Sequence, residues 1–227
     1  MSTAPPLKPL RWLRGAWRRW SLWALLVVLV GAMLVTLVWL AGRYEASVVQ
    51  DQLERDTSDA AADIRAALSR NLLNLQALQS LQMGAPDVPR WEAQALALLR
   101  EHRELVRMEW RSPALRLQAH VNSPFHPIEW RNEVRLEAHS ETALACANAR
   151  RLSGPAYSSS YFQPHGDGLG SELIEFCLPP SAGDREAGYL IATYSLRSVL
   201  TEMVGHGLTR RQEVSFTEAD GTRLALV

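Results

Sequence analysis

The strongest pattern along the chain is an uninterrupted run of apolar residues near its N-terminus. Ser21 to Gly42 spans 22 residues, contains no charged side chain and is rich in leucine and valine. A helix that crosses the hydrocarbon core of a bilayer needs about 20 such residues, whereas a buried helix of a soluble protein is rarely apolar on every side. Trp20, Trp23 and Trp39 stand near the two ends, where amphipathic rings favour the headgroup region. The pattern predicts a transmembrane helix over residues 21–42.

The charges beside this run predict its orientation. Residues 1–20 carry five basic side chains and no acidic one, while the far side offers only Arg43 and Arg55 nearby. Because basic flanks stay in the cytoplasm, we expect residues 1–20 to form a cytoplasmic basic tail that also contacts membrane lipid. Residues 43–227 would then lie on the opposite, extracytoplasmic side of the membrane. A cleaved signal peptide is the alternative, although its apolar region is about 7–15 residues long and ends in a small-x-small site.

A long helical pattern follows the span. Residues 43–82 contain neither proline nor glycine, and mostly apolar residues recur at steps of three and four, which is the spacing of one helical face. These residues are Val49, Leu53, Thr57, Ala60, Ile64, Ala67, Asn71, Leu75, Leu78 and Gln82. Gly84 and Pro86 end the pattern. We expect a stalk helix over residues 43–84 that pairs with a second copy in a homodimer; packing against its own domain alone is the alternative.

Residues 85–207 alternate between the periods of helices and strands. A helical pattern runs from Trp91 to about Arg103, and two stretches, 106–111 and 115–121, then alternate apolar with polar residues. This alternation is typical of a hairpin with one apolar and one charged face. The other expected elements are a helix over 133–152, strands over 157–162, 173–178 and 188–196, and a short helix over 198–207. The order predicts an α+β fold, with an antiparallel sheet flanked by helices.

The last residues predict a further hairpin. Val214–Thr217 and Arg223–Val227 read as two strands around Asp220-Gly221, which is a turn signal. The pattern reaches Val227 inside a strand. We therefore expect residues 208–227 to open a second module that is truncated here.

The charge balance disfavours nucleic acid as a partner. Five of the 24 basic residues precede the span, which leaves 19 against 24 acidic residues beyond it, a net charge of about −5. Binding to phosphate backbones needs a basic surface, which residues 43–227 do not provide by composition.

Both cysteines, Cys146 and Cys177, fall in the part expected outside the cytoplasm. In an oxidising compartment a disulfide between them would close a loop of about 30 residues and stabilise the fold by about 3 kcal/mol. Two buried free thiols are the alternative.

The order of the expected elements resembles the extracytoplasmic Cache (PAS-like) sensor region of bacterial transmembrane receptors. The local likeness lies in residues 189–200, YLIATYSLRSVL, a strand running into a helix, and in residues 214–225, VSFTEADGTRLA, a strand–Asp-Gly–strand unit. The resemblance implies a PAS-like module with a five-stranded antiparallel sheet, a ligand pocket on one face and a homodimer. It also implies a receptor in a bacterial inner membrane, with residues 43–227 in the periplasm. Such receptors are chiefly two-component sensor histidine kinases with a cognate response regulator, or else chemoreceptors or cyclic-dinucleotide enzymes.

The chain contains no catalytic signature. It has no G-x-S-x-G elbow, no Walker loop, no paired cysteines at zinc spacing and no histidines at short ligand spacing. We therefore expect no catalytic residue, no metal and no cofactor in this segment; ATP and Mg²⁺ are expected only if a kinase domain follows.

A binding pocket is the remaining candidate site. Tyr157 and Tyr161 are four residues apart in one expected strand and should share a face, with His165 in the turn that follows. Tyr189 and Thr193 share a face of the last strand. Arg131 precedes the central helix and could bind the carboxylate of a small molecule. The predicted function is reception of a small extracytoplasmic ligand and relay of the signal across the membrane. A complete membrane-tethered periplasmic adaptor is the rival.

Overall fold

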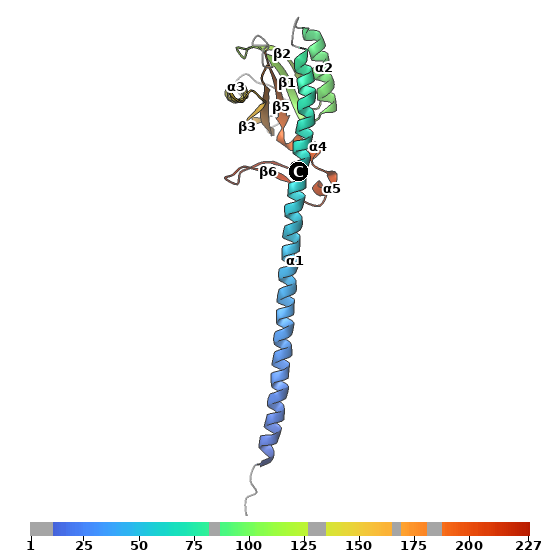
Figure 1. Ribbon diagram of the computed structural model, residues 1–227, viewed down its shortest axis with the longest axis vertical. Coiled ribbons are helices and arrows are strands. Elements are labelled where there is room, and N and C mark those ends of the chain that lie inside the picture. The colour runs from blue at the N-terminus through green and yellow to red at the C-terminus, as the bar shows by residue number, and fades with distance from the viewer. Residues whose placement is uncertain (1–10, 82–86, 127–134, 165–168, 181–187) are drawn as a thin grey trace, which may run out of the picture. The chain divides into compact units, whose positions relative to one another are not determined.

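The computed structural model describes residues 11–81, 87–126, 135–164, 169–180 and 188–227. The chain divides into two compact units, residues Met1–Asp56 and Thr57–Val227. Helix α1 (Arg11–Ser80) contributes to both of them and is the long helix of Figure 1.

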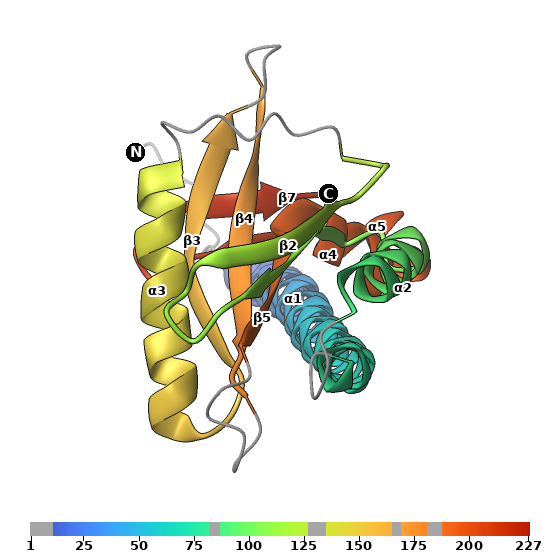
Figure 2. The same cartoon turned by 90° about the horizontal axis from the view of Figure 1, so that it is seen from above.

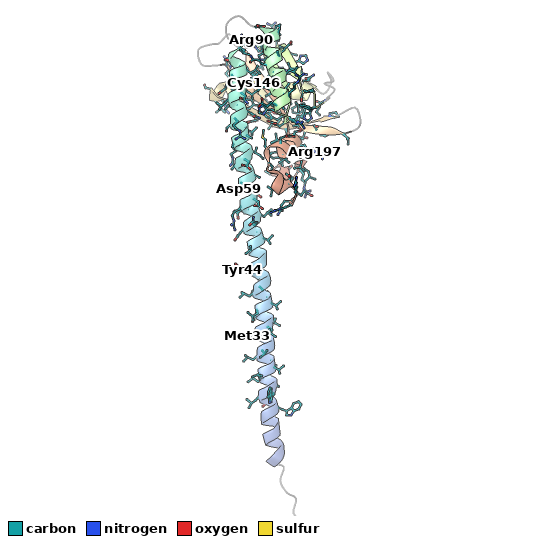
Figure 3. The ribbon with its side chains drawn as sticks, turned by 90° about the vertical axis from the view of Figure 1, so that its right-hand side faces the viewer. Met33, Tyr44, Asp59, Arg90, Cys146 and Arg197 are labelled. Carbon is teal, nitrogen blue, oxygen red and sulfur yellow. A yellow bond between two sulfur atoms is a disulfide. The ribbon has the colours of Figure 1, made fainter. Side chains whose placement is uncertain are left out.

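In the first unit, α1 contains one segment that is long and apolar enough to cross a membrane. The apolar side chains of this segment are exposed, and Met33 and Tyr44 project away from the helix in Figure 3. Val49 and Leu53, the first two members of the predicted stripe, are exposed as well. A helix without internal partners for its apolar surface agrees with a lipid environment.

The second unit is built on a five-stranded sheet with the order β2-β1-β5-β4-β3 and with antiparallel neighbours throughout. Its strands are β1 (Leu105–Arg111), β2 (Leu117–Asn122), β3 (Ala156–Pro164), β4 (Gly170–Leu178) and β5 (Tyr189–Ser195). The helices of this unit are α2 (Val88–Glu101), α3 (Arg135–Leu152), α4 (Leu196–Met203) and α5 (His206–Thr209). The predicted α+β class, with an antiparallel sheet flanked by helices, is confirmed.

Helices cover both sides of this sheet, with α3 on one side and the second half of α1 together with α2 on the other (Figure 2). The main core lies on the α1–α2 side. It joins Leu75 and Leu78 of α1 and Trp91 of α2 to apolar residues of the central strands, such as Met108 and Leu190. The tilted rings of Trp91 and Trp110 lie 6.2 Å apart in this core.

The predicted stripe on α1 packs within the chain itself from Ala60 onward. Ala60, Asn71, Leu75 and Leu78 are buried, and Ile64 is partly buried against the core. This is the arrangement weighed as the alternative to pairing with a second copy. Dimerisation stays a prediction.

The C-terminal hairpin forms as β6 (Ser215–Thr217) and β7 (Arg223–Leu226), which are antiparallel. Val214, Phe216 and Ala225 pack, partly buried, around Leu200 and Val204. These residues therefore belong to the same compact unit as the sheet. That the hairpin opens a further module stays a prediction.

The apolar and the charged face of β1 form as the alternation predicts. Both faces are covered, however, since all seven residues from Leu105 to Arg111 are buried. The reason is position: β1 pairs with both β2 and β5, so it is an inner strand. Arg107, Glu109 and Arg111 are consequently buried on the sheet face opposite the main core.

Candidate functional site

A row of polar residues crosses four strands of the sheet. Asn122 pairs in register with Arg107, Arg107 with Thr193, and Thr193 with Glu175. Three of these residues, Arg107, Thr193 and Glu175, are at least 96% buried. Buried charged groups at the centre of a sheet are expensive unless they are hydrogen-bonded, so the partners of this polar row define the candidate site.

Arg107 and Arg111 both hold Glu109. Arg107 Nε donates to Glu109 Oε1 and Arg111 Nε to Glu109 Oε2, each at 2.6 Å. The three side chains come from alternate positions of β1, which places them on one face. Burial acts to raise the pKa of Glu109, but the charges of Arg107 and Arg111 and their hydrogen bonds bring it below its usual value. Glu109 is therefore ionised between two guanidinium groups.

The Nη1 atoms of the two arginines bond groups at the edge of the sheet. Arg107 Nη1 donates to Asn122 Oδ1 at 2.9 Å, and Arg111 Nη1 to the carbonyl oxygen of Leu115 at 3.3 Å. Leu115 has a φ of 57°, a left-handed conformation that is uncommon for a residue with a side chain. The turn between β1 and β2 is thus tied to the buried charges.

Glu175 is surrounded differently. Tyr161 Oη donates to Glu175 Oε1 at 2.5 Å, and Thr193 Oγ1 donates to Oε2 at 3.0 Å. Both of these donors are neutral hydroxyls. Burial, aided by the charge of Glu109, raises the pKa of Glu175 to about 7, while the two hydroxyl hydrogen bonds oppose the shift. The carboxyl can therefore exchange a proton near neutral pH.

Tyr161 responds to the same surroundings. Its burial and the nearby Glu175 carboxyl raise the pKa of the phenol far above its ordinary value. Tyr161 is thus a hydrogen-bond donor at every physiological pH.

A disulfide lies on the same side of the sheet. Cys146 of α3 and Cys177 of β4 are bonded, with their Cα atoms 5.2 Å apart, within the range that disulfide geometry requires. Both cysteines are buried, together with Ala149, Tyr189 and Ile191. Because Cys177 is two residues from Glu175 on one strand, the bond ties α3 over the polar face (Cys146 is labelled in Figure 3).

The bond has a direct chemical test. In protein from an oxidising compartment, we expect neither thiol to react with iodoacetamide under denaturing, non-reducing conditions, and both to react after reduction. Mass spectrometry of the Cys146 and Cys177 peptides reads both states. Alkylation of either cysteine before reduction would show that the thiols are free.

Five of the six residues predicted to bind a ligand fall into three groups. Tyr161 and Thr193 meet at Glu175, as described. Tyr189 is buried on the same face, beside the disulfide. Arg131 and His165 lie outside the described residues.

The expectation that Tyr157 and Tyr161 share a face is wrong. Tyr157 packs its ring 5.0 Å from that of Phe176, a residue of the main core. Tyr161 instead donates to Glu175, which immediately precedes Phe176 in β4. The cause is a register shift between Tyr157 and Ser160 in the pairing of β3 with β4, because one extra residue reverses the side to which the following residues point.

Four residues of the polar face were not among the site residues predicted from the sequence: Arg107, Glu109, Arg111 and Glu175. The sequence did indicate the first three, because Arg107 and Arg111 each stand two residues from Glu109 and should share its face of a strand. Glu175 gave a weaker indication, as a lone acidic residue between apolar residues of a strand.

The arrangement offers groups that can bind a polar ligand. These are guanidinium, carboxyl, phenol and hydroxyl groups on one face of the sheet. Within the described parts of the chain, no three His, Cys, Asp or Glu side chains cluster as they would around a metal ion. Guanidinium groups bind carboxylates, and Glu175 can accept from, or when protonated donate to, a polar ligand.

Comparisons with known proteins return likenesses of structure only. No protein-family model matches the sequence, and no curated protein does so. One similar structure is the ligand-binding domain of the Pseudomonas aeruginosa PAO1 amino acid chemoreceptor PctC in complex with GABA. Its TM-score is 0.46 at 13% identity, over 72% of this chain and 70% of that one. Another is the extracellular domain of a protein named as the histidine kinase soHK1S-Z6, with a TM-score of 0.45 at 10% identity, over 73% of this chain and 65% of that one.

Proposed function

We propose that this chain is the membrane-anchored sensing region of a bacterial receptor, and that the polar face of its sheet binds a small ligand. One observation carries the proposal: the apolar segment and the sheet are joined by the same helix, α1, whose second half packs on the sheet. A bound ligand would act on the membrane segment by changing how the sheet packs against α1. It can do so only to the extent that it binds the two packing states with different affinity.

The topology, the oligomeric state and the output that we propose rest on the charges beside the apolar run and on the family resemblance. The N-terminus is cytoplasmic, residues 43–227 are periplasmic, and the receptor is a homodimer in the inner membrane. The output is a histidine kinase that acts on a response regulator. We take the ligand to be a small carboxylate, because Arg107 and Arg111 bring two positive charges to the polar face against the single ionised carboxylate of Glu109.

The test is ligand-dependent thermal stability of the chain in detergent. A panel of small carboxylates is screened by the shift of the unfolding midpoint, since a ligand that binds only the folded state stabilises it by mass action. We expect at least one compound to raise the midpoint, and we expect Tyr161→Phe to reduce the shift. The variant removes one hydroxyl that contacts Glu175.

Tyr157→Phe is the matched control. It removes the same atom from the same strand, but on the side of the main core. The proposal requires that this variant keep the wild-type shift. Equal loss in both variants, or no shift with any carboxylate, would count against the polar face as the binding site.

A further inference from the structure

A pocket opens between α3 and the turn that joins β1 to β2, on the same side of the sheet as the polar face. Its volume is about 380 Å³, which lies in the range of small-molecule sites. The turn lies beside α3 (Figure 2), and its Leu115 packs against the buried cluster that contains the disulfide. Tyr189, the first residue of β5, also lines the pocket.

Short side chains make the α3 wall of this pocket. Ala143 and Ala147 are one helical turn apart, and Arg150 follows on the same face of the helix. Cys146 completes the wall, and its disulfide fixes α3 to β4. The wall is therefore apolar apart from Arg150, and its position is set by a covalent bond.

The turn forms the opposite wall, with Pro113 and Leu115. Its backbone is held by a hydrogen bond from Leu115 N to the carbonyl oxygen of Ser112 at 2.8 Å. Arg111 Nη1 in turn donates to the carbonyl oxygen of Leu115. Because both walls are held by other parts of the fold, the pocket is formed before a ligand enters, which lowers the cost of binding.

Tyr189 brings a phenol to the pocket. It pairs in register with Arg111 and is only 6% exposed. Among the described residues its hydroxyl has no hydrogen-bond partner, unlike that of Tyr161, which donates to Glu175. A tyrosine hydroxyl in a buried position usually finds a partner, and a ligand in the pocket would supply one.

Arg150 brings an uncommitted positive charge. Its exposed side chain forms no ion pair or hydrogen bond within the described part of the chain, whereas the neighbouring Arg151 bonds a side chain of the same helix. The end of α3 does not need it as a cap, since the carbonyl oxygens of Ala149 and Arg150 already accept from backbone N–H groups that follow the helix. The guanidinium is therefore available to an anion.

We propose that this pocket binds a small carboxylate with a compact apolar body. The carboxylate accepts hydrogen bonds from Tyr189 Oη and Arg150, and the body packs between the alanines of α3 and Leu115. The site is separate from the polar groups around Glu175, because Tyr189 and Thr193 are four residues apart in β5, about 13 Å. The inference does not depend on ligand binding at Glu175 or on a signalling role.

The probe for this site is para-fluorobenzoate, which joins a carboxylate to a compact ring. Fluorine NMR follows it with the full chain in lipid nanodiscs at about pH 7, where a carboxylate is ionised, and empty nanodiscs give the lipid background. We expect saturable binding. The amide para-fluorobenzamide has the same shape without the charge and should bind at least about tenfold more weakly.

Three substitutions test the pocket. Arg150→Gln removes the charge and should raise the Kd of the probe at least about tenfold. Tyr189→Phe removes only the hydroxyl and should raise the Kd about threefold to tenfold. Ala147→Leu fills the pocket and should abolish binding. The position is exposed and leucine is a good helix former, so this variant keeps the fold.

Three matched controls make the same kinds of change outside the pocket, and each should keep the wild-type Kd. Arg116→Gln removes an exposed charge of the same turn, Asn148→Leu adds a leucine at the next position of α3, and Tyr161→Phe removes the hydroxyl that contacts Glu175.

The site is overturned if the wild type shows no saturable binding, or if any of the three pocket variants keeps the wild-type Kd. An equal loss in the controls overturns it as well. Loss of binding in Tyr161→Phe but not in Tyr189→Phe would place the probe on the polar face, which contradicts this site and supports the proposed function. The two proposals can therefore fail separately.

Discussion

Replacing Glu109 with glutamine is expected to destabilise the fold by about 3–5 kcal/mol, the range for removing one partner of a buried ion pair. Glu109 is the shared acceptor of Arg107 and Arg111 at 2.6 Å. Glutamine keeps the shape but offers only one oxygen, and its amide nitrogen would face a second donor. Two buried guanidinium groups would lose their common counter-charge. Urea unfolding of the full chain in detergent, followed by tryptophan fluorescence, measures the change.

Glu213→Gln provides the matched control. Glu213 Oε1 accepts from Arg223 Nη1 at 3.0 Å, but the side chains are 61% and 65% exposed. Exposed ion pairs contribute little, about 0–1 kcal/mol. We therefore expect the control to leave the free energy of unfolding within about 1 kcal/mol of the wild type. A loss of similar size in both variants would show that the Glu109 effect does not come from buried charge.

The second large effect concerns pH. The pKa of Glu175 is about 7 in the folded chain against an ordinary 4.5, so the folded state keeps a proton that the unfolded state releases. Stability contributed by this proton is present below the unfolded pKa and is lost as pH rises through the folded one, by about 3 kcal/mol. We expect Glu175→Gln to remove this loss, because glutamine stays neutral. The variant should match the wild type near pH 5 and exceed it in stability near pH 8.

Glu172→Gln tests whether this effect is specific. Glu172 is on the same strand as Glu175 but is partly exposed. Its replacement should leave the difference in stability between pH 5 and pH 8 as in the wild type. The pKa of His102 is raised by its hydrogen bond to Glu104, so His102 also makes stability fall as pH rises. Because His102 is unchanged in both variants, its contribution cancels when each variant is compared with the wild type. A Glu175→Gln variant that loses stability with pH as steeply as the wild type contradicts the protonated carboxyl.

Local patterns predicted the elements of this fold well. The apolar run, the helical stripe and the period-two stretches all depend on neighbours within a few residues, and these elements formed close to their expected bounds. The stripe even included Asn71, a polar residue among mostly apolar ones. Its Nδ2 donates to Glu104 Oε1, a partner 33 residues away that a local pattern cannot reveal.

The candidate site could be predicted only in part, because burial is a property of the whole sheet. The alternation of Arg107, Glu109 and Arg111 was visible in the sequence. The residues of β1 alone do not reveal, however, that β1 lies between two other strands. Likewise, the four-residue spacing of Tyr157 and Tyr161 was valid for an ideal strand, and one bulge reversed it. Tyr161 and Thr193 were identified by residue type and strand face, while their common partner Glu175 was missed.

The covalent tie between α3 and β4 has a consequence for how the chain matures. Bonding of Cys146 to Cys177 needs an oxidant, which bacterial cells supply after export and withhold in the cytoplasm. The residues of the polar face fold beside this bond, since Cys177 and Glu175 lie on one strand. If residues 43–227 are exported as we propose, newly made chains carry an untied α3 until they have crossed the membrane, and the polar face is completed only on the far side.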